Sequence, residues 1–278
     1  MGADPRLELL ESSLRELGGC LVAYSGGVDS TFLLAVARRV LGDRVAAATV
    51  RTLFLERGEV DDAHARAQAI GAPHEIIDVD LAGSPEVLAN PPDRCYHCKR
   101  LVFETLRRRA DWLGLPAVID ATHADDLRER RPGLRALREL GVASPLAAAG
   151  LGKADIRELS ATLGIAGGER LSSPCLATRV PYGSPITAER LRRISGAEQI
   201  LRGLGFAGSR VRDYGELARL EVRPEDLERA AAWPLRRGIV APLGELGYRY
   251  VTLDLAGYRS GSMDEVLPAA ELAKPSGP

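Results

Sequence analysis

Hydrophobic and polar residues alternate in two patterns along the first 165 positions of the chain. Short unbroken apolar runs predict buried parallel strands, and apolar residues three or four positions apart predict helices. The predicted strands lie at 20–24, 44–50, 74–80 and 117–126, and the predicted helices at 6–18, 30–42, 59–70, 96–113 and 153–164. Strands that alternate with helices form a parallel sheet covered on both faces. The pattern therefore predicts a doubly wound α/β domain in residues 1–170.

The remaining residues follow a different pattern, which predicts a smaller α+β domain at 171–265. It begins with a loop at 172–187 that is rich in proline and serine, as are segments that separate domains or build sites. A helix, two adjacent strands, a short helix and a last strand are predicted at 188–205, 209–215, 217–222, 224–232 and 248–256. Residues 266–278 contain three prolines and predict a flexible tail.

The composition of the chain limits the classes of protein to which it can belong. The chain has 278 residues, of which 45% are hydrophobic, so it is long enough and apolar enough for substantial cores. The formal net charge of −1 gives no support for a nucleic-acid partner, because dedicated nucleic-acid binders are usually basic. The sequence shows no signal-peptide pattern and no apolar run that predicts a membrane span, so we expect a cytoplasmic protein with reduced thiols.

The segment "SGGVDS" at 25–30 follows the first predicted strand and opens the next predicted helix. Its glycines allow close approach of an anion, and Ser25 and Ser30 add hydroxyl groups at the positive end of a helix. Asp29 would orient a metal ion or the loop, because a carboxylate repels bare phosphate. The segment matches neither the Walker motif nor the dinucleotide motif. The simpler alternative is a glycine turn before an N-cap.

This segment resembles the PP-loop of the ATP pyrophosphatases. The resemblance implies cleavage of ATP between its α and β phosphates, adenylation of a carbonyl oxygen of the substrate, and displacement of AMP by nitrogen or sulfur. It also implies that the pyrophosphate end of ATP, together with Mg²⁺, is bound by Ser25, Gly26, Gly27, Val28, Asp29 and Ser30.

Three of the four cysteines are candidates for chemistry. Cys20 lies in a predicted buried strand, where an inert thiol is the default. Cys95 and Cys98 are two residues apart in "DRCYHCKR", and Cys175 follows much later in "SSPCLATRVPYG". Structural zinc normally takes four protein ligands, whereas a 4Fe–4S cluster on three thiolates leaves one iron open for an extra sulfide. A zinc or redox element formed by Cys95 and Cys98 alone remains the alternative.

The segment "PCLATRVPYG", together with residues 131–164 and 209–222, is similar to the LarE-type ATP-dependent sulfur transferases. The resemblance covers nearly the whole chain. Family members adenylate a carboxylate of pyridinium-3,5-dicarboxylate mononucleotide and replace its oxygen by sulfur. The product is the organic part of the nickel-pincer nucleotide, the cofactor of lactate racemase. The resemblance therefore implies ATP, Mg²⁺ and a small nucleotide substrate, with a homo-oligomer, a sulfide source and a downstream nickel-insertion protein as partners.

The family has two sources of sulfur. Some members sacrifice the sulfur of a single cysteine, and others carry a 4Fe–4S cluster on three cysteines. Cys95, Cys98 and Cys175 place this chain with the cluster-dependent members, and Cys175 as a sacrificial donor remains an alternative. A PP-loop tRNA thiolase is the second hypothesis and a non-catalytic nucleotide sensor the third, although the near-neutral charge disfavours tRNA.

The resemblance also implies roles for individual residues. Asp125 and Asp126 follow a predicted strand end and are Mg²⁺ candidates, or else an N-cap pair. His123 stands where the family usually has asparagine. The catalytic residues implied are Cys175, Asp29 and Arg179, and the residues implied to bind the substrate are Thr178, Arg179, Glu198, Arg210 and Arg212. Arg210 and Arg212 are two apart on a predicted strand and point the same way, as substrate ligands or as a solvated face.

Overall fold

A parallel four-stranded sheet forms the centre of the first half of the chain. In the computed structural model, which describes residues 4–55, 58–165, 175–259 and 261–269, this sheet has the order β3-β2-β1-β4. Its strands are β1 (Cys20–Ala23), β2 (Val45–Arg51), β3 (His74–Asp78) and β4 (Ala117–Ile119), and every pairing between them is parallel. Their carboxyl ends therefore meet at one edge of the sheet.

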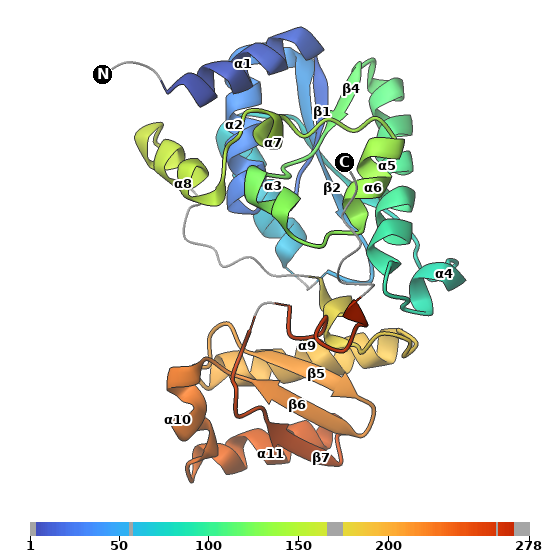
Figure 1. Cartoon of the computed structure of the whole chain (residues 1–278), viewed down its shortest axis with the longest axis vertical. Helices are drawn as coiled ribbons and strands as arrows, with labels where there is room; N and C mark the ends of the chain where they lie inside the picture. Colours follow the sequence, from blue (N-terminus) through green and yellow to red (C-terminus); the bar gives the residue numbers. More distant parts are fainter. Residues whose placement is uncertain (1–3, 56–57, 166–174, 260, 270–278) are drawn as a thin grey trace.

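Helices cover both faces of this sheet, because successive side chains of a strand point to opposite sides. Cys20 and Val22 pack into one apolar cluster with α1, α2, α3, α7 and α8, and Leu21 packs into another with α5 and α6 (Figure 1). A parallel sheet with a core on each face confirms the predicted doubly wound α/β fold. The helices of this half are α1 (Pro5–Leu17), α2 (Val28–Leu41), α3 (Glu59–Ile70), α4 (Pro85–Leu88), α5 (Arg94–Leu113), α6 (Gly133–Glu139), α7 (Pro145–Ala148) and α8 (Lys153–Thr162), with 3₁₀ turns η1 (Gly42–Arg44) and η2 (Ala124–Arg128).

A second, three-stranded sheet follows in the order β5-β6-β7. β5 (Arg210–Tyr214) and β6 (Leu217–Glu221) are antiparallel, whereas β7 (Tyr250–Leu253) is parallel to β6. The sheet packs on α9 (Ala188–Gly203) and α11 (Leu235–Glu245). These elements enclose a third apolar cluster, called the second core below because it is the core of the second half, which includes Leu201, Phe206 and Leu243. The other elements of this half are η3 (Leu176–Arg179), η4 (Pro224–Asp226) and α10 (Leu227–Ala231).

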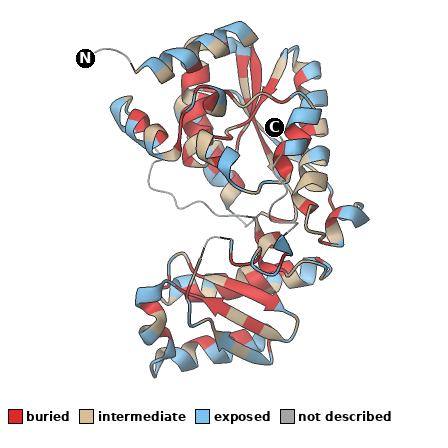
Figure 2. Ribbon diagram, in the orientation of Figure 1, coloured by how far each residue is buried: buried red, intermediate tan, exposed pale blue. Residues whose placement is uncertain are grey.

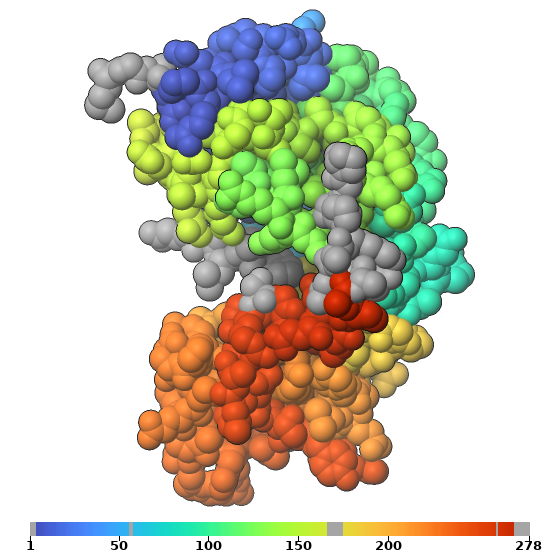
Figure 3. Space-filling model, in the orientation of Figure 1, coloured from blue at the N-terminus to red at the C-terminus, as the bar shows by residue number. Residues whose placement is uncertain are grey.

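A fourth apolar cluster joins the two halves. Phe54, Leu81 and Val87 come from the first half, and they pack against residues of the second half that include Leu176 and Ile194. Figure 2 shows buried residues in both bodies and in the region between them, and Figure 3 shows the segment 261–269 at the boundary of the two bodies. The junction is therefore packed through side chains from both halves.

Some predictions concern residues outside the described ranges. The predicted domain boundary at residue 170 lies within 166–174, and most of the predicted tail lies within 270–278, so neither is described. Within the described part of the chain, no helix combines the length and hydropathy needed to cross a membrane.

Candidate active site

The Ser25–Ser30 loop joins the carboxyl end of β1 to the first turn of α2. Its own hydroxyl groups brace it: the Ser25 and Ser30 Oγ atoms are 3.1 Å apart, and the Gly27 amide donates to Ser25 Oγ at 3.3 Å. The first amide of α2 that bonds back along the helix is that of Thr31, which donates to the Gly27 carbonyl. The preceding amides of the first turn are the groups that a helix offers to an anion.

Two features require glycine at position 26: the left-handed backbone conformation there and the close packing of Ala63. Its φ is +70°, and a Cβ atom added there would lie 2.8 Å from the Cβ of Ala63 on α3. We expect Gly26→Ala to cost about 1–3 kcal/mol of folding free energy and to weaken ATP binding at least about tenfold, because the loop must move. Thermal unfolding and equilibrium binding of ATP measure the two effects.

Gly71→Ala is the matched control. Gly71 ends α3 with a similar φ of +74°, but an added Cβ meets no atom within 4 Å. We expect this variant to lose stability through its backbone alone, about 1–2 kcal/mol, and to bind ATP normally. Equal ATP affinity in the two variants would show that the packing of Gly26 on Ala63 does not shape the loop.

A cavity of about 450 Å³ opens at the carboxyl edge of the parallel sheet. This edge is where open α/β sheets bind their ligands, and the volume lies in the range of small-molecule sites. The cavity, called the edge cavity below, lies among the ends of β1 and β2, the loop after β4 and one side of α5. Polar residues that line it are Ser25, Asp29, Ser30, Thr49, Glu59, Lys99, Asp120, Thr122, His123, Asp126, Arg131 and Lys153.

Two carboxylates, those of Asp29 and Asp126, line the edge cavity. Asp29 Oδ1 is buried without a hydrogen-bond partner among the described residues. Burial raises the pKa of Asp29; the positive charges of His123 and Lys153 lower it, and the negative charge of Asp126 raises it. Asp126 accepts from the His123 amide at 3.2 Å and contacts Arg131 at 2.7 Å. An orphaned carboxylate oxygen close to a second carboxylate fits the oxygen-rich coordination of Mg²⁺.

Asp125 differs from Asp126 in the contacts that its side chain makes. Its Oδ2 accepts a hydrogen bond of 2.8 Å from the amide of Lys153, the first residue of α8, and Asp125 does not line the edge cavity. It therefore acts on the start of a helix, as in the N-cap alternative. His123 lies between the two acids, 3.3 Å from Asp126 and 3.9 Å from Asp125, so the residue that departs from the family pattern is inside the site.

The sequence analysis did not single out the two lysines that line the edge cavity. Lys99 and Lys153 both line it, although the chain has only three lysines. Lys99 Nζ lies 3.8 Å from Asp120 Oδ2, and its aliphatic stem occupies the space where Gly133 has no side chain. The available signals were positional: Lys99 directly follows Cys98, and Lys153 opens a predicted helix.

The thiols of Cys95, Cys98 and Cys175 come together from two distant parts of the sequence. Cys95 and Cys98 lie near the start of α5, and Cys175 directly precedes η3. Burial raises the pKa of Cys98 to about 12, and the negative charges of Cys175 and Cys95 add to the effect. Burial also raises the pKa of Cys175, which Arg94 lowers and Cys95 raises. These mutual effects define a three-thiol site.

The geometry of this site bears on which metal it fits. Among the described residues, no three His, Cys, Asp or Glu side chains have the arrangement of ligands around a single metal ion. An iron–sulfur cluster places each thiolate on a different iron, so its ligands are farther apart than those of one zinc ion. None of the three cysteines lines the edge cavity, but Lys99, the residue after Cys98, does. Cys20 is elsewhere, in the core of the first half.

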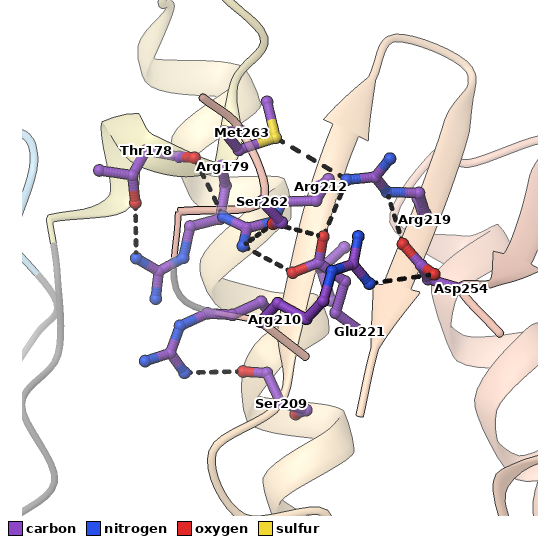
Figure 4. A network of polar contacts seen from close by, with 12 residues as sticks. Thr178, Arg179, Ser209, Arg210, Arg212, Arg219, Glu221, Asp254, Ser262 and Met263 are labelled. Atoms are coloured by element: carbon purple, nitrogen blue, oxygen red, sulfur yellow. Dashed lines mark hydrogen bonds and ion pairs between the residues drawn. The ribbon is translucent and has the colours of Figure 1, made fainter. Parts of the chain in front are cut away.

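The predicted substrate residues gather beside the three-thiol site. Arg179 is fully buried and forms two bonds with Glu198, of 2.8 and 3.0 Å. Arg212 donates to Glu221 at 2.6 Å and to the Thr178 carbonyl at 3.1 Å (Figure 4). These two guanidinium groups are therefore already neutralised by buried carboxylates and hold η3 against α9 and β5.

Arg210 differs from the other two arginines. Its Nη1 donates to the backbone carbonyls of Gly208 and Ser209, and its guanidinium lies over the ring of Tyr258. No carboxylate forms an ion pair with it in the described part of the chain. Burial lowers the pKa of Arg210, and the positive charge of Arg179 lowers it further. Of the three, Arg210 has the positive charge best placed to meet an anionic ligand.

Relatives of the chain decide its family. No family model matches it. An uncharacterized protein of Synechocystis is 42% identical over 264 residues, which cover 95% of this chain and 98% of that protein. The pyridinium-3,5-bisthiocarboxylic acid mononucleotide synthase of Lactiplantibacillus plantarum is 35% identical over 265 residues, 95% of each chain. The chain belongs to the LarE family.

More distant similarity places the LarE family among ATP-using enzymes with the same loop. A glutamine-hydrolysing GMP synthase of Aeropyrum pernix is 27% identical over 217 residues, which cover 70% of this chain and 42% of that protein. This likeness agrees with the parallel sheet and confirms the relation to the PP-loop ATP pyrophosphatases.

Proposed function

We propose that the protein is an ATP-dependent sulfur transferase that converts a carboxylate of pyridinium-3,5-dicarboxylate mononucleotide into a thiocarboxylate. The observation that carries the proposal is the 35% identity, over nearly the full length of both chains, to the synthase of Lactiplantibacillus plantarum. The product leads to the nickel-pincer nucleotide, so the protein serves the maturation of lactate racemase or a related enzyme.

The edge cavity supplies the groups for the adenylation half of the reaction. The amides and hydroxyls of the Ser25–Ser30 loop bind the pyrophosphate of ATP, and Lys99 and Lys153 offset its negative charge. Asp29 and Asp126 would hold Mg²⁺, which neutralises charge on the phosphates. Adenylation is needed because a carboxylate oxygen is a poor leaving group, whereas AMP is a good one.

The arginine cluster supplies the groups that bind the pyridinium substrate. Arg210 has no carboxylate partner among the residues that the structure describes, so its charge can pair with a phosphate or a carboxylate of the substrate. Arg179 and Arg212 act mainly through η3, which they hold in place beside Cys175. Thr178 adds a hydroxyl at the same turn, although it already donates to the Cys175 carbonyl.

The three-thiol site supplies the sulfur half. Three thiols that lie close enough to act on one another's charge, from two distant parts of the chain, are the ligands that we assign to a 4Fe–4S cluster. When bound, such a cluster would offer one iron without a protein ligand as the place for sulfide. The proposal includes a cytoplasmic location, a homo-oligomer, and partners that deliver sulfide or insert nickel. Cys175 as a sacrificial donor is the second candidate, because it is the thiol nearest to the substrate arginines in sequence.

The experiment that tests the proposal starts from protein purified without oxygen. The iron-loaded protein is mixed with ATP, Mg²⁺, sulfide and pyridinium-3,5-dicarboxylate mononucleotide, and the products are read by mass spectrometry. We expect AMP together with a substrate in which sulfur has replaced oxygen. Release of AMP without sulfur incorporation, or retention of zinc in place of iron, would contradict the cluster-dependent reaction. Conversion of Cys175 to dehydroalanine would identify it as the donor.

A further inference from the structure

Arg94 places a buried positive charge inside the three-thiol site. Only 3% of this residue is exposed. Its Nη1 donates to Asn90 Oδ1 at 2.5 Å and to the Ala177 carbonyl at 3.1 Å, and its Nη2 donates to Cys95 Sγ at 3.5 Å. No carboxylate in the described ranges forms an ion pair with it. A buried guanidinium without an anionic partner is costly, so its partner must be found among its other neighbours.

The neighbours of Arg94 that can carry negative charge are thiols. The Nη2 atom of Arg94 lies 3.5 Å from Cys95 Sγ, and the Ala177 carbonyl that its Nη1 atom binds is two residues after Cys175. Arg179, the other arginine near Cys175, is already paired with Glu198. Arg94 is therefore the cation whose charge is left to balance the thiolates or an anionic group bound to them.

Asn90 fixes the direction of Arg94 and also holds the chain that follows Cys175. It is fully buried and has a φ of +56°, the left-handed region that a non-glycine residue seldom adopts. Its Nδ2 donates to the carbonyls of Val180 and Pro181 at 3.1 and 2.8 Å. Its own carbonyl accepts from the Gly183 amide at 2.8 Å.

These bonds join two segments that are about eighty residues apart in the sequence. Asn90 lies in the connection just before α5, and Arg94 opens α5 ahead of Cys95 and Cys98; the groups that these two residues bind, from Ala177 to Gly183, follow Cys175. We propose that Arg94, oriented by Asn90, is the positioning residue that keeps Cys175 beside Cys95 and Cys98 and balances the charge of the group they bind. This inference rests on the proposed function and adds to it the residue on which the three-thiol site depends.

The first test uses the protein without metal, under reducing and oxygen-free conditions. A short bis-maleimide joins thiols only when they are close, and peptide mass spectrometry counts the links from Cys175 to Cys95 or Cys98. We expect Arg94→Met to lower the linked fraction at least about fivefold, and Arg94→Lys to lie between Arg94→Met and the unmodified protein. Arg100→Gln is the control, because Arg100 is on the exposed side of the same helix, where its side chain donates to Glu104 at 3.1 Å.

Two substitutions of Asn90 separate the role of its side chain from that of its left-handed backbone conformation. Asn90→Gly keeps the left-handed conformation but removes the bonds to Arg94, Val180 and Pro181, whereas Asn90→Ala also strains the backbone. We expect Asn90→Gly to lose the link as Arg94→Met does, and to unfold at a lower temperature because three buried hydrogen bonds are lost, although less so than Asn90→Ala; linking is measured well below both midpoints. Linking at the unmodified level in folded Arg94→Met and Asn90→Gly would overturn the proposal.

The second test uses the iron-loaded protein and measures its reduction potential by spectroscopic titration. Loss of a nearby positive charge disfavours the added electron, so we expect Arg94→Met to move the potential to more negative values and Arg94→Lys to restore it. A purely structural role for Arg94 predicts no such rescue by lysine. If the unmodified protein retains no iron, the cluster part of the proposed function fails, and the linking experiment on the metal-free protein still decides the role of Arg94.

Discussion

Replacing Cys175 with serine will abolish sulfur incorporation and leave adenylation in place. Serine cannot donate sulfur, and its hydroxyl is a poor ligand for the soft iron of a cluster, so we expect a loss of more than about a hundredfold. AMP release should persist because no cysteine lines the edge cavity. Mass spectrometry of the substrate and a separate assay of AMP measure the two halves of the reaction.

Two further cysteine variants sharpen this result. Cys20→Ala should transfer sulfur normally, since Cys20 lies in the apolar core, with only a modest loss of stability from the small cavity. Cys95→Ser separates the two sources of sulfur. If the cluster is the carrier, Cys95→Ser is as inactive as Cys175→Ser; if it still completes one turnover and Cys175 becomes dehydroalanine, the sacrificial mechanism holds.

Asp29→Asn will lose ATP turnover and gain stability. An amide is a weak ligand for Mg²⁺ and cannot neutralise its charge, so we expect turnover to fall by roughly 10²–10³. Burial raises the pKa of Asp29, so ionising this carboxyl in the folded protein costs free energy that asparagine does not incur. The stability gain should be present at pH 7.5, shrink as the pH falls below the raised pKa of Asp29 in the folded protein, and vanish well below 3.8, where the acid is protonated in both states. Thermal unfolding at several pH values measures it.

Asp125 and Asp126 provide a matched comparison, because only one of these two neighbouring acids lines the edge cavity. Asp125→Asn weakens the bond to the Lys153 amide at the start of α8, so it should lose up to about 1 kcal/mol of stability and keep most of its ATP turnover. Asp126→Asn should lose turnover, as Asp29→Asn does, because both carboxylates line the edge cavity. Equal turnover in the Asp29 and Asp125 variants would argue against the assignment of the metal to Asp29 and Asp126.

Much of the first half of the chain follows from local pattern. The apolar runs predicted each strand of the parallel sheet to within a few residues, and β4 passes after Ile119 into the predicted loop, which contains a 3₁₀ turn. In the second half, α11 was not predicted, because Pro242 lies inside it and Pro234 precedes it. Its apolar face packs in the second core, and this tertiary contact outweighs the local cost of a proline within the helix.

The site was harder to predict where function depends on contacts between distant residues. Asp125 and Asp126 are adjacent and chemically alike in sequence, but the 3₁₀ turn sends one to α8 and the other to the edge cavity. Nothing local shows that Arg179 and Arg212 are neutralised by Glu198 and Glu221, while Arg210 is not. Pairing of this kind is set by the tertiary fold, so pattern and motif can name the candidate residues without separating their roles.

Among the residues that the structure describes, those that line the edge cavity all come before position 154, whereas the three-thiol site also uses Cys175. The groups that bind ATP and the third thiol therefore come from different parts of the chain. The bonds from Asn90 and Arg94 to the segment after Cys175 hold these parts together, so the supply of sulfur depends on contacts that the binding of ATP does not need.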